Sequence, residues 1–405
     1  MAKADPIFAN PFRPGAGHIP PYLAGREIER DEFARLLRQD VILENMILTG
    51  LRGVGKTVLL ETFKPIAQSA GWLWVGADLS EAATISEDAL ATRLITDLSI
   101  VSSAFSMDVV RDPRLLQRES VTASQPLDYV TLAEHFNTTP GLVSDKLRSV
   151  LELVWSNIPR NGQRGIIFAY DEAQNLADHS AKDQYPLSLL LETFQSIQKK
   201  DIPFMLVLTG LPTLFPKLVE ARTYAERMFR VVFLERLAEA ASKEAILKPI
   251  TETNCPIRFS DESVEIIYRI SGGYPYFIQF ICREVFDLFI QKTEVGKPRV
   301  VPVDEIVRKL DTDFFSGRWA RATDRQRQLL WVIAQLPNCE SEFTAQEVVE
   351  RSRLAEFKSF SPSHVNQMLA TLSEAGLIYK NRRGKYSFAV PLLSGFINRQ
   401  GPPAY

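Results

Sequence analysis

The most informative stretch of the sequence is Gly50-Leu51-Arg52-Gly53-Val54-Gly55-Lys56-Thr57. It fits the pattern GxxxxGK[ST], follows a short apolar run at residues 46–48 and leads into a helical stretch that begins with Val58. Glycines let the backbone N–H groups of such a turn point inward around phosphates, and the N-terminus of the next helix adds positive potential. We expect Lys56 to reach the β- and γ-phosphates and the hydroxyl group of Thr57 to bind Mg²⁺. Residues 50–58 are therefore predicted to hold the phosphates of a nucleotide with magnesium.

Short apolar runs separated by helical stretches surround this turn. They lie at residues 41–43 and 46–48, 72–75, 166–170, 204–208 and 231–234. Continuous apolar runs of this length, with helices between them, are typical of strands that are buried on both faces of a parallel sheet. The pattern predicts an α/β fold, with a P-loop core and a parallel sheet over residues 22–238. Residues 83–160 look mostly helical and are predicted to form a helical insertion in that core.

An acidic pair, Asp171-Glu172, directly follows the apolar run at residues 166–170. A parallel strand that ends beside the first one would bring Asp171 close to the metal ion. Glu172 would then stand where water attacks the γ-phosphate. Two neighbouring acids can serve these roles because Mg²⁺ holds one of them while the other accepts a proton. The alternative is an acidic strand end that faces solvent, and the phosphate-binding pattern makes this the weaker interpretation.

The two flanks of the predicted core have other patterns. Residues 1–21 contain five prolines and are predicted to form an extended arm lying on the domain that follows, because proline is excluded from helix interiors and central strands. The apolar spacing of residues 26–39 predicts a helix. Beyond the core, the pattern turns helical and predicts a small lid over residues 239–300. Its expected helices lie at 239–250, 261–271 and 275–291, and helical signals resume at 304–315.

The tail, residues 318–405, is predicted to be a winged helix-turn-helix. Helices are expected at 321–335, 344–353 and 361–375. Ser361-Pro362 is a favourable start for the third helix, and Gly376 a favourable end. Residues 377–379 and 386–388 then flank Lys380-Asn381-Arg382-Arg383-Gly384-Lys385, which predicts a two-stranded hairpin with a basic tip.

The motifs, taken in order, resemble those of the AAA+ and STAND ATPases. The resemblance is strongest to the branch of archaeal and origin-recognition-type initiators and their bacterial relatives. Residues 23–29 resemble the hhGRExE segment, residues 50–57 the Walker A motif and residues 167–172 the Walker B motif. The tail resembles the winged-helix module of the family, so the resemblance covers about residues 22–400. It implies that the protein binds ATP with Mg²⁺ and hydrolyses it.

The same resemblance assigns roles to single residues. Gly25, Arg26 and Glu27 would lie near the adenine, which argues for ATP rather than GTP. Thr209 would occupy the sensor 1 position, although a hydroxyl group at the end of a buried strand can also be purely structural. Arg227 would be an arginine finger that acts across a subunit interface, which implies an ATP-dependent oligomer. Two neighbours, Arg222 and Arg230, could serve instead, and any of the three could be an ordinary surface arginine.

The lid departs from the family pattern in one respect. Gly272-Gly273-Tyr274-Pro275 resembles the GxP motif, but the sensor 2 arginine that many AAA+ lids carry shortly after the glycines is missing. Tyr276 follows, and Arg283 comes later. This favours nucleotide contact through Pro275, as in STAND proteins, and argues against fast, processive hydrolysis.

Charge is concentrated in the last part of the chain. Residues 358–405 contain six basic residues and one acidic residue, a net charge of 6 − 1 = +5 in a chain whose total is −2. Such a local field attracts the phosphates of duplex DNA. The predicted contacts are Ser363, Asn366 and Gln367 at the front of the third helix, with Lys380, Arg382, Arg383 and Lys385 at the hairpin tip. The alternative is that this module packs against a partner protein or against its own ATPase domain.

The composition sets outer limits on function. The three cysteines and four histidines are scattered, which argues against a disulfide framework and a zinc site. The N-terminal residues lack a signal-peptide core, and no stretch approaches the ~20 apolar residues of a membrane span, so the cytoplasm is the expected location. The sequence as a whole favours an ATP-driven DNA-binding switch. The alternatives are a scaffold that oligomerises on ATP and contacts only protein, and a nucleotide-binding regulator with negligible turnover.

Overall fold

The computed structural model describes residues 9–15, 17–110, 122–158, 162–253, 257–294, 301–382 and 384–402. The chain divides into two compact units, each with its own hydrophobic core. One, called here the sheet unit, consists of Glu27–Thr49 and Leu59–Phe233. The other, called the helical unit, consists of Met1–Arg26, Gly50–Val58 and Leu234–Tyr405.

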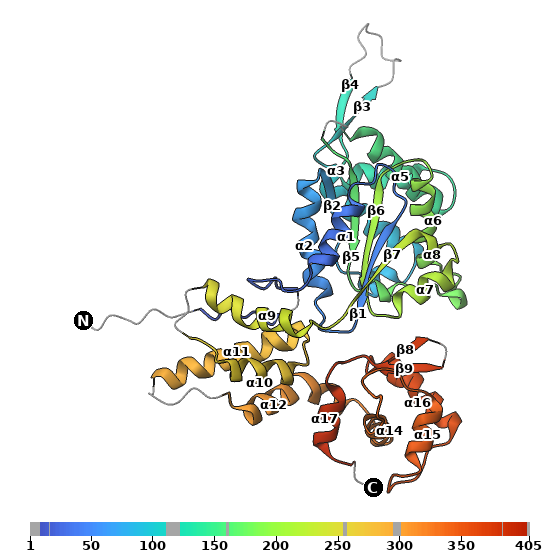
Figure 1. Ribbon diagram of the computed structural model, residues 1–405. Helices are drawn as coiled ribbons and strands as arrows, with labels where there is room; N and C mark the ends of the chain where they lie inside the picture. The colour runs from blue at the N-terminus through green and yellow to red at the C-terminus, as the bar shows by residue number, and fades with distance from the viewer. Residues whose placement is uncertain are drawn as a thin grey trace, which may run out of the picture. The chain divides into compact units, whose positions relative to one another are not determined.

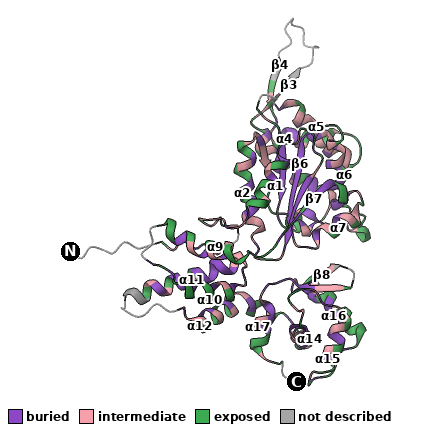
Figure 2. Cartoon of the chain, in the orientation of Figure 1, coloured by how far each residue is buried: buried purple, intermediate pink, exposed green. Residues whose placement is uncertain are grey.

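The sheet unit is built on a five-stranded sheet in the order β2-β5-β6-β1-β7 (Figure 1). The strands are β1 (Asn45–Gly50), β2 (Trp72–Val75), β5 (Gly165–Tyr170), β6 (Phe204–Gly210) and β7 (Phe229–Leu234). The pairings β2·β5, β5·β6 and β1·β6 are parallel. Every residue of β1, β5 and β6 is buried, as Figure 2 shows in purple, so the central strands are covered on both faces. The α/β fold predicted from the apolar runs is confirmed.

Helices cover the two faces of this sheet. The helices of the sheet unit are α1 (Glu27–Leu36), α2 (Lys56–Ser69), α3 (Glu87–Ser102), α4 (Tyr129–Thr138), α5 (Val143–Asn157), α6 (Pro186–Gln198), α7 (Leu214–Ala221) and α8 (Ala225–Met228), with α2 beginning in the phosphate-binding loop. On one face, Phe33 of α1 stacks on Phe63 of α2 with ring centroids 4.1 Å apart. On the other, Phe168 of β5 packs edge-on against Phe194 of α6 at 5.0 Å, in a core that also includes α3, α5 and α7.

Residues 83–160 depart from the expected helical insertion. Two antiparallel strands, β3 (Ser106–Val110) and β4 (Thr122–Pro126), lie within this stretch, so the helical prediction is wrong for residues 106–110 and 122–126. Pro126 disfavours the helical region for the residue before it, Gln125, and so favours extended backbone there. Helices α3, α4 and α5 do form, and their buried side chains belong to the core of the sheet unit.

The helical unit contains α9 (Glu239–Glu252), α10 (Asp261–Ser271), α11 (Pro275–Glu294) and α12 (Val303–Leu310). The π-helical turn η4 (Asp311–Phe315) and α13 (Ser316–Ala320) connect these helices to the tail. The tail consists of α14 (Asp324–Ala334), α15 (Ala345–Ser352), α16 (Pro362–Glu374), β8 (Ile378–Arg382), β9 (Lys385–Phe388) and α17 (Leu393–Gln400). Helix α17 was not predicted from the sequence. In the described part of the chain, no helix combines the length and apolar character needed to cross a membrane.

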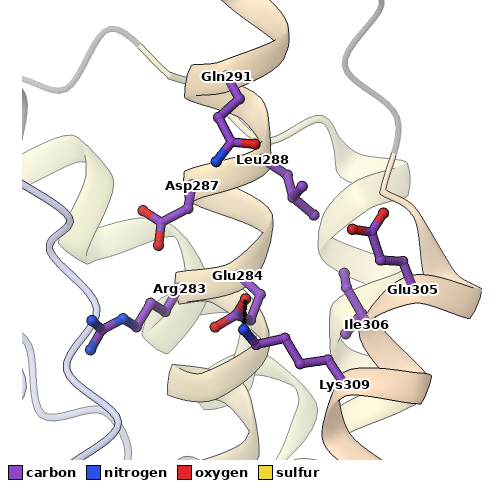
Figure 3. Close-up of a pocket in the computed structure, with 8 residues that line it drawn as sticks. All are labelled: Arg283, Glu284, Asp287, Leu288, Gln291, Glu305, Ile306 and Lys309. Atoms are coloured by element: carbon purple, nitrogen blue, oxygen red, sulfur yellow. Dashed lines mark ion pairs between the residues drawn. The ribbon is translucent and has the colours of Figure 1, made fainter.

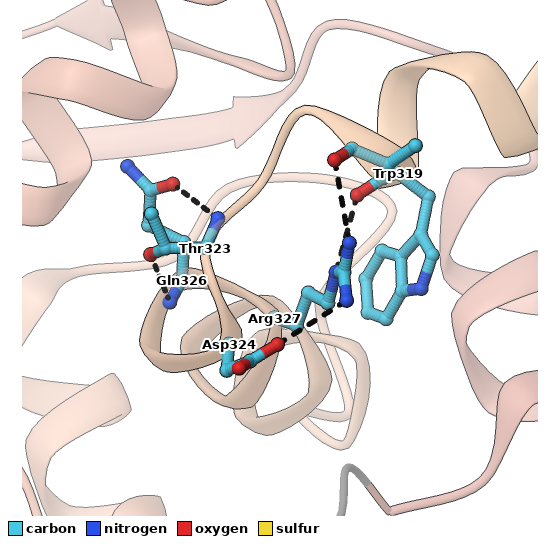
Figure 4. A network of polar contacts seen from close by, with 6 residues as sticks. Trp319, Thr323, Asp324, Gln326 and Arg327 are labelled. Atoms are coloured by element: carbon cyan, nitrogen blue, oxygen red, sulfur yellow. Dashed lines mark hydrogen bonds and ion pairs between the residues drawn. The ribbon is translucent and has the colours of Figure 1, made fainter.

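The beginning of the tail is fixed by polar contacts that Figure 4 shows. Thr323 caps α14 by accepting from the backbone of Gln326, whose side chain binds back to the backbone of Thr323. Arg327 donates to the carbonyl oxygen of Trp319 at 3.2 Å and pairs with Asp324 at 3.2 Å. Capping boxes of this kind satisfy the free N–H groups at a helix start.

Aromatic side chains join the lid helices to the tail. Phe277 of α11 packs edge-on against Phe314 of η4, with ring centroids 4.9 Å apart. Phe315, the next residue, is fully buried and stacks on Phe396 of α17 at 5.2 Å. Rings in these arrangements contribute attraction beyond the area they bury. The lid helices and the tail therefore share one continuous core.

The N-terminal arm packs against the helical unit. Phe12 is 1% exposed and stacks on Phe259 at 6.2 Å. The side chain of Asn10 donates to the carbonyl oxygen of Arg283 at 3.0 Å and to Asp287 at 2.8 Å. The arm was expected to lie on the domain that follows it in the sequence. Its described residues place Phe12 among the lid helices, where burial of a large apolar ring is favourable.

Candidate nucleotide site

The phosphate-binding loop of residues 50–57 has the backbone that its glycines permit. Gly50, Gly53 and Gly55 have φ angles of 157°, 79° and 91°, all in the region that favours glycine. A Cβ atom at Gly50 would lie 2.4 Å from the carbonyl oxygen of Leu234, whereas a Cβ atom at Gly55 would meet no heavy atom within 4 Å. Gly50 therefore packs against the backbone of Leu234, where no side chain would fit. Gly55 borders open space of the kind that a phosphate group needs.

The ammonium group of Lys56 lies against the backbone of the loop. The ammonium group of Lys56 donates to the carbonyl oxygens of Gly50 at 2.9 Å and Leu51 at 3.0 Å. Val54 is buried, Thr57 and Val58 are partly buried, and Arg52 is exposed. The guanidinium group of Arg52 lies 3.5 Å from the position that a Cβ atom would take at Gly376, so it points toward the end of α16.

Two neighbouring segments hold this loop by its carbonyl oxygens. Arg26, 6% exposed, donates to the carbonyl oxygens of Val54 at 2.9 Å and Glu235 at 2.7 Å. The backbone N–H of Tyr276, at the start of α11, donates to Gly53 at 3.1 Å. Arg26 was predicted to lie near an adenine, and the observed contacts make it a clamp on the phosphate loop.

The other residues predicted to bind the nucleotide, Gly25, Glu27 and Pro275, are sequence neighbours of Arg26 and Tyr276. Gly25 has a φ of 60°, and a Cβ atom there would approach Ala241 of α9 to 2.6 Å. Pro275 is the first residue of α11, and Glu27 is exposed at the start of α1. The sequence did not indicate Tyr276. Its position directly after the glycine-rich turn and Pro275 was the available signal.

The acidic half of the predicted site lies in the sheet unit, at the edge where parallel strands end. Asp171, 4% exposed, follows β5, and Thr209 lies in β6. The hydroxyl group of Thr209 donates to the carboxylate of Asp171, which also accepts from the backbone N–H of Glu172 at 2.7 Å. Thr209 is level with Leu48 in the sheet, one strand over, so β1 enters the phosphate loop from the same edge. The structure thus brings Asp171 and Thr209 together.

Glu172 has an unusual backbone and a specific partner. Its φ and ψ angles of 53° and 31° place it in the left-handed region, which costs a non-glycine residue on the order of 1 kcal/mol. Its carboxylate is exposed and accepts a hydrogen bond from the side-chain amide of Gln174. Strained residues of this kind cluster at functional sites, where the surrounding structure holds them in place.

Gln174 joins the acidic pair to the segment after β6. Its side-chain oxygen accepts from the backbone N–H of Leu211 at 3.1 Å, and its carbonyl oxygen accepts from the ammonium group of Lys217 at 2.8 Å. Burial lowers the pKa of Lys217, which lies on α7. The sequence did not indicate Gln174 or Lys217 as part of the site. Only the position of Gln174, two residues after Glu172, could have drawn attention to it.

Three arginines near β7 were candidates for contact across a subunit interface. Arg222 lies 3.8 Å from Glu192, and Arg230 pairs with Glu32 at 2.7 Å. The hydrogen bond from Arg230 to Glu32 raises the pKa of that guanidinium group. Arg227, on α8, is exposed and forms no ion pair with any residue that the structure describes. Arg227 is therefore the candidate whose charge is most available to a partner.

A cleft of about 460 Å³ lies outside the predicted site, between α11 and α12 (Figure 3). Its walls carry charges of both signs, and Lys309 pairs with Glu284 across it at 3.2 Å. Arg283, the late arginine of the lid, is among its lining residues. The cleft contains no residue of the phosphate loop or the acidic pair.

The tail presents a polar helix face. On α16, Ser363, Asn366 and Gln367 are exposed, while the opposite face of the helix is buried through Val365, Met368, Leu369 and Leu372. In the hairpin, Lys380 is exposed and Lys385 partly buried, and Arg382 is the last residue of β8. Arg383 lies outside the described residues.

Two family models match the sequence. Residues 22–219 match an AAA ATPase domain, and residues 312–397 match a domain of unknown function, DUF8462. No curated protein matches the sequence.

Solved structures with similar folds span nearly the whole chain. The Walker-type ATPase PABY2304 of Pyrococcus abyssi is 16% identical with a TM-score of 0.55, and the match covers 93% of this chain and 96% of that one. The ORC2 protein of Aeropyrum pernix in its ADP form is 13% identical with a TM-score of 0.55, and the match covers 96% of this chain and 97% of that one. At such identities the likeness concerns the fold.

The AAA match covers most of the residues that the sequence predicts to bind the nucleotide. Residues 22–219 include the phosphate loop, the acidic pair Asp171-Glu172 and Thr209. The loop follows β1, the pair follows β5, and Thr209 lies in β6 between them in the sheet. Residues 22–219 therefore form a segment that matches the AAA ATPase domain and carries its P-loop.

Proposed function

We propose that this protein binds ATP with Mg²⁺, hydrolyses it slowly and uses it as a switch that controls association of its tail with duplex DNA. The observation that carries the nucleotide part is the phosphate loop: positive φ angles at Gly53 and Gly55, and open space where a Cβ atom would stand at Gly55. Backbone N–H groups in such a loop, followed by the start of α2, form an anion site.

The residues of the loop and the acidic pair suit magnesium. The hydroxyl group of Thr57 and the carboxylate of Asp171 are hard oxygen donors, which Mg²⁺ prefers. Thr209 supports this role because its hydrogen bond keeps the carboxylate of Asp171 in one orientation. Bound Mg²⁺ would supply positive charge against the β- and γ-phosphates.

The side chains of the chain itself would carry the remaining roles. Lys56 would exchange its contacts with the loop carbonyls for the β- and γ-phosphate oxygens, to which an ammonium group donates strong hydrogen bonds. Glu172 would orient a water molecule and accept its proton as the oxygen attacks the γ-phosphate. Arg227 would act on a neighbouring copy's nucleotide, which requires an oligomer that forms on ATP. Gly25, Glu27 and Pro275 would line the nucleotide as the family resemblance implies.

The DNA part rests on the polar face of α16. Ser363, Asn366 and Gln367 are spaced for one face of a helix and are all exposed, which suits contact with base edges. Lys380, Arg382, Arg383 and Lys385 would contact phosphates, as in winged-helix modules. The shared core of lid and tail would transmit the change between ATP and ADP, since only ATP offers a γ-phosphate to Lys56 and Thr209.

Phosphate release from purified protein tests the nucleotide part. Wild-type protein should release phosphate only with Mg²⁺ present, and Glu172→Gln should lower the rate by roughly 100-fold or more while ATP still binds. Equal rates in both proteins would remove Glu172 as the base.

Duplex binding by the full chain tests the DNA part. Affinity should fall steeply with salt, and Lys380→Ala should reduce the slope of log affinity against log salt by about 1. An absence of binding at low salt, with and without ATP, would favour a tail that contacts protein only.

A further inference from the structure

The side chain of Gln174 uses both ends of its amide at the acidic half of the site. Its N–H donates to the carboxylate of Glu172, and its oxygen accepts from the backbone N–H of Leu211 at 3.1 Å. The planar side-chain amide of Gln174 thus connects Glu172, which follows β5, with Leu211, the first residue after β6. The position of one end therefore constrains the other.

The segment after β6 fits closely around this amide. A Cβ atom at Gly210 would lie 2.7 Å from the side-chain oxygen of Gln174, closer than such atoms approach. The ammonium group of Lys217 on α7 holds the carbonyl oxygen of Gln174 at 2.8 Å. Glycine at position 210 therefore leaves room for the side chain of Gln174, and Lys217 holds its backbone.

Glu172 needs such a partner because nothing else described holds its carboxylate. The side chain is exposed and its backbone is in the left-handed region. An exposed glutamate samples several rotamers, and a general base must keep its oxygen within hydrogen-bond reach of the attacking water. A single donor on one carboxylate oxygen restricts the group and leaves the other oxygen to accept a proton.

We infer that Gln174 is a positioning residue that orients the carboxylate of Glu172 and ties this orientation to the segment from Leu211 to α7. The inference rests on the proposed function, in which Glu172 is the base. Helix α8, which carries Arg227, follows α7 directly in the chain. A neighbouring copy that contacts this segment would change the orientation of the base through Leu211 and Lys217.

The test is steady-state hydrolysis by variants of the full chain. Gln174→Met keeps the length of the side chain and removes both hydrogen bonds. We expect kcat to fall about tenfold, the effect of one lost hydrogen bond to a charged group, while KM and the affinity for a non-hydrolysable ATP analogue change by less than about twofold. Asn175→Leu is the matched control. Its amide lies in the same turn but donates to the carbonyl oxygen of Leu79 at 2.8 Å, so kcat should stay within about twofold of wild type.

Gln174→Glu separates positioning from a purely structural role. A carboxylate can still accept from Leu211, but it has no donor for Glu172. We expect kcat to stay at least about tenfold low. Recovery of wild-type kcat in Gln174→Glu would mean that the bond to Leu211 alone matters and would overturn the inference.

The same assays distinguish a failure of the proposed function from a failure of the role of Gln174. If Glu172→Gln hydrolyses ATP as fast as wild type, or wild type does not hydrolyse it, the proposed function fails and the inference with it. If Glu172→Gln is inactive but Gln174→Met retains kcat and KM within about twofold of wild type, only the inference is overturned. Thermal unfolding of each variant identifies any that has lost its fold. In that case Gln174→Asn, which shortens the side chain but keeps the amide, is used instead of the unfolded variant. A fall of kcat alone in Gln174→Asn supports the inference, and an unchanged kcat contradicts it.

Discussion

The phosphate loop and the acidic pair, the two halves of the proposed nucleotide site, are held in different ways. In the phosphate loop, the carbonyl oxygens of Gly53 and Val54 accept from Tyr276 and Arg26, so the backbone is what the neighbours hold. In the acidic half, side chains hold side chains, as in the pair Thr209 and Asp171. The first arrangement places demands mainly on glycine and on backbone geometry. The second depends on a particular side chain at each position, and single substitutions should separate the two.

The largest effect is expected at Lys56, whose ammonium group would exchange the carbonyl oxygens of the loop for phosphate oxygens. Lys56→Ala removes the ammonium group, and we expect ATP affinity to fall by roughly 100-fold or more, because two charge-assisted hydrogen bonds are lost. Calorimetric titration measures it. Lys64→Ala, an exposed position on the same helix, should bind like wild type. Similar affinities for both variants would show that the loop does not bind phosphate.

Arg26→Met probes the clamp on the loop. The substitution leaves the carbonyl oxygens of Val54 and Glu235 without this donor, and a buried acceptor without a partner costs about 1–3 kcal/mol. We expect a lower unfolding temperature and an affinity for ATP reduced by about tenfold. Reduced stability with unchanged affinity would mean that Arg26 supports the fold and not the loop.

Thr209→Val tests the side-chain half. Valine has the shape of threonine but cannot donate to Asp171, so the carboxylate loses one of its contacts. A hydrogen bond to a charged group is worth about 1.5–3 kcal/mol, and we expect kcat to fall by about tenfold with ATP affinity little changed. Thr193→Val is the control, since that buried hydroxyl group has no partner within the described structure. It should unfold at the same temperature or higher, and a kcat for Thr209→Val equal to that of this control would contradict the proposed role.

The smallest effect is expected at Tyr276. Because its backbone N–H makes the contact with Gly53, Tyr276→Phe should change ATP affinity by less than about twofold. The same titration measures it. A loss of more than about tenfold would show that the hydroxyl group takes part in binding and would weaken the contrast between the two halves.

The sequence predicted those parts of the molecule whose signals are local. The strands around Ile47, Phe168 and Leu206 were evident because continuous apolar runs are a property of neighbouring residues. The phosphate loop was evident because glycine, lysine and threonine must occur at fixed spacing. The lid helices lie within a few residues of their predicted ends, since capping and apolar periodicity are also local.

The missed features depend on contacts between distant residues or on backbone strain. Tyr276 contacts Gly53 only after folding, and nothing near either residue marks the pair. Gln174 is close to Glu172 in sequence, but its contact arises from the left-handed backbone of Glu172, which the sequence does not reveal. Likewise, only the structure shows that Glu32 pairs with Arg230 and that Glu192 lies close to Arg222.

The stacking of Phe315 on Phe396 bears on how the chain can be divided. A fragment that begins near residue 318 would leave Phe396 without its neighbour and expose a ring that is 1% accessible in the whole chain. Such a fragment should aggregate and be poorly soluble, so measurements on it would say little about the tail in the intact chain. The family segment that starts at residue 312 keeps Phe314 and Phe315 with the tail, which marks the lower limit for an excised module.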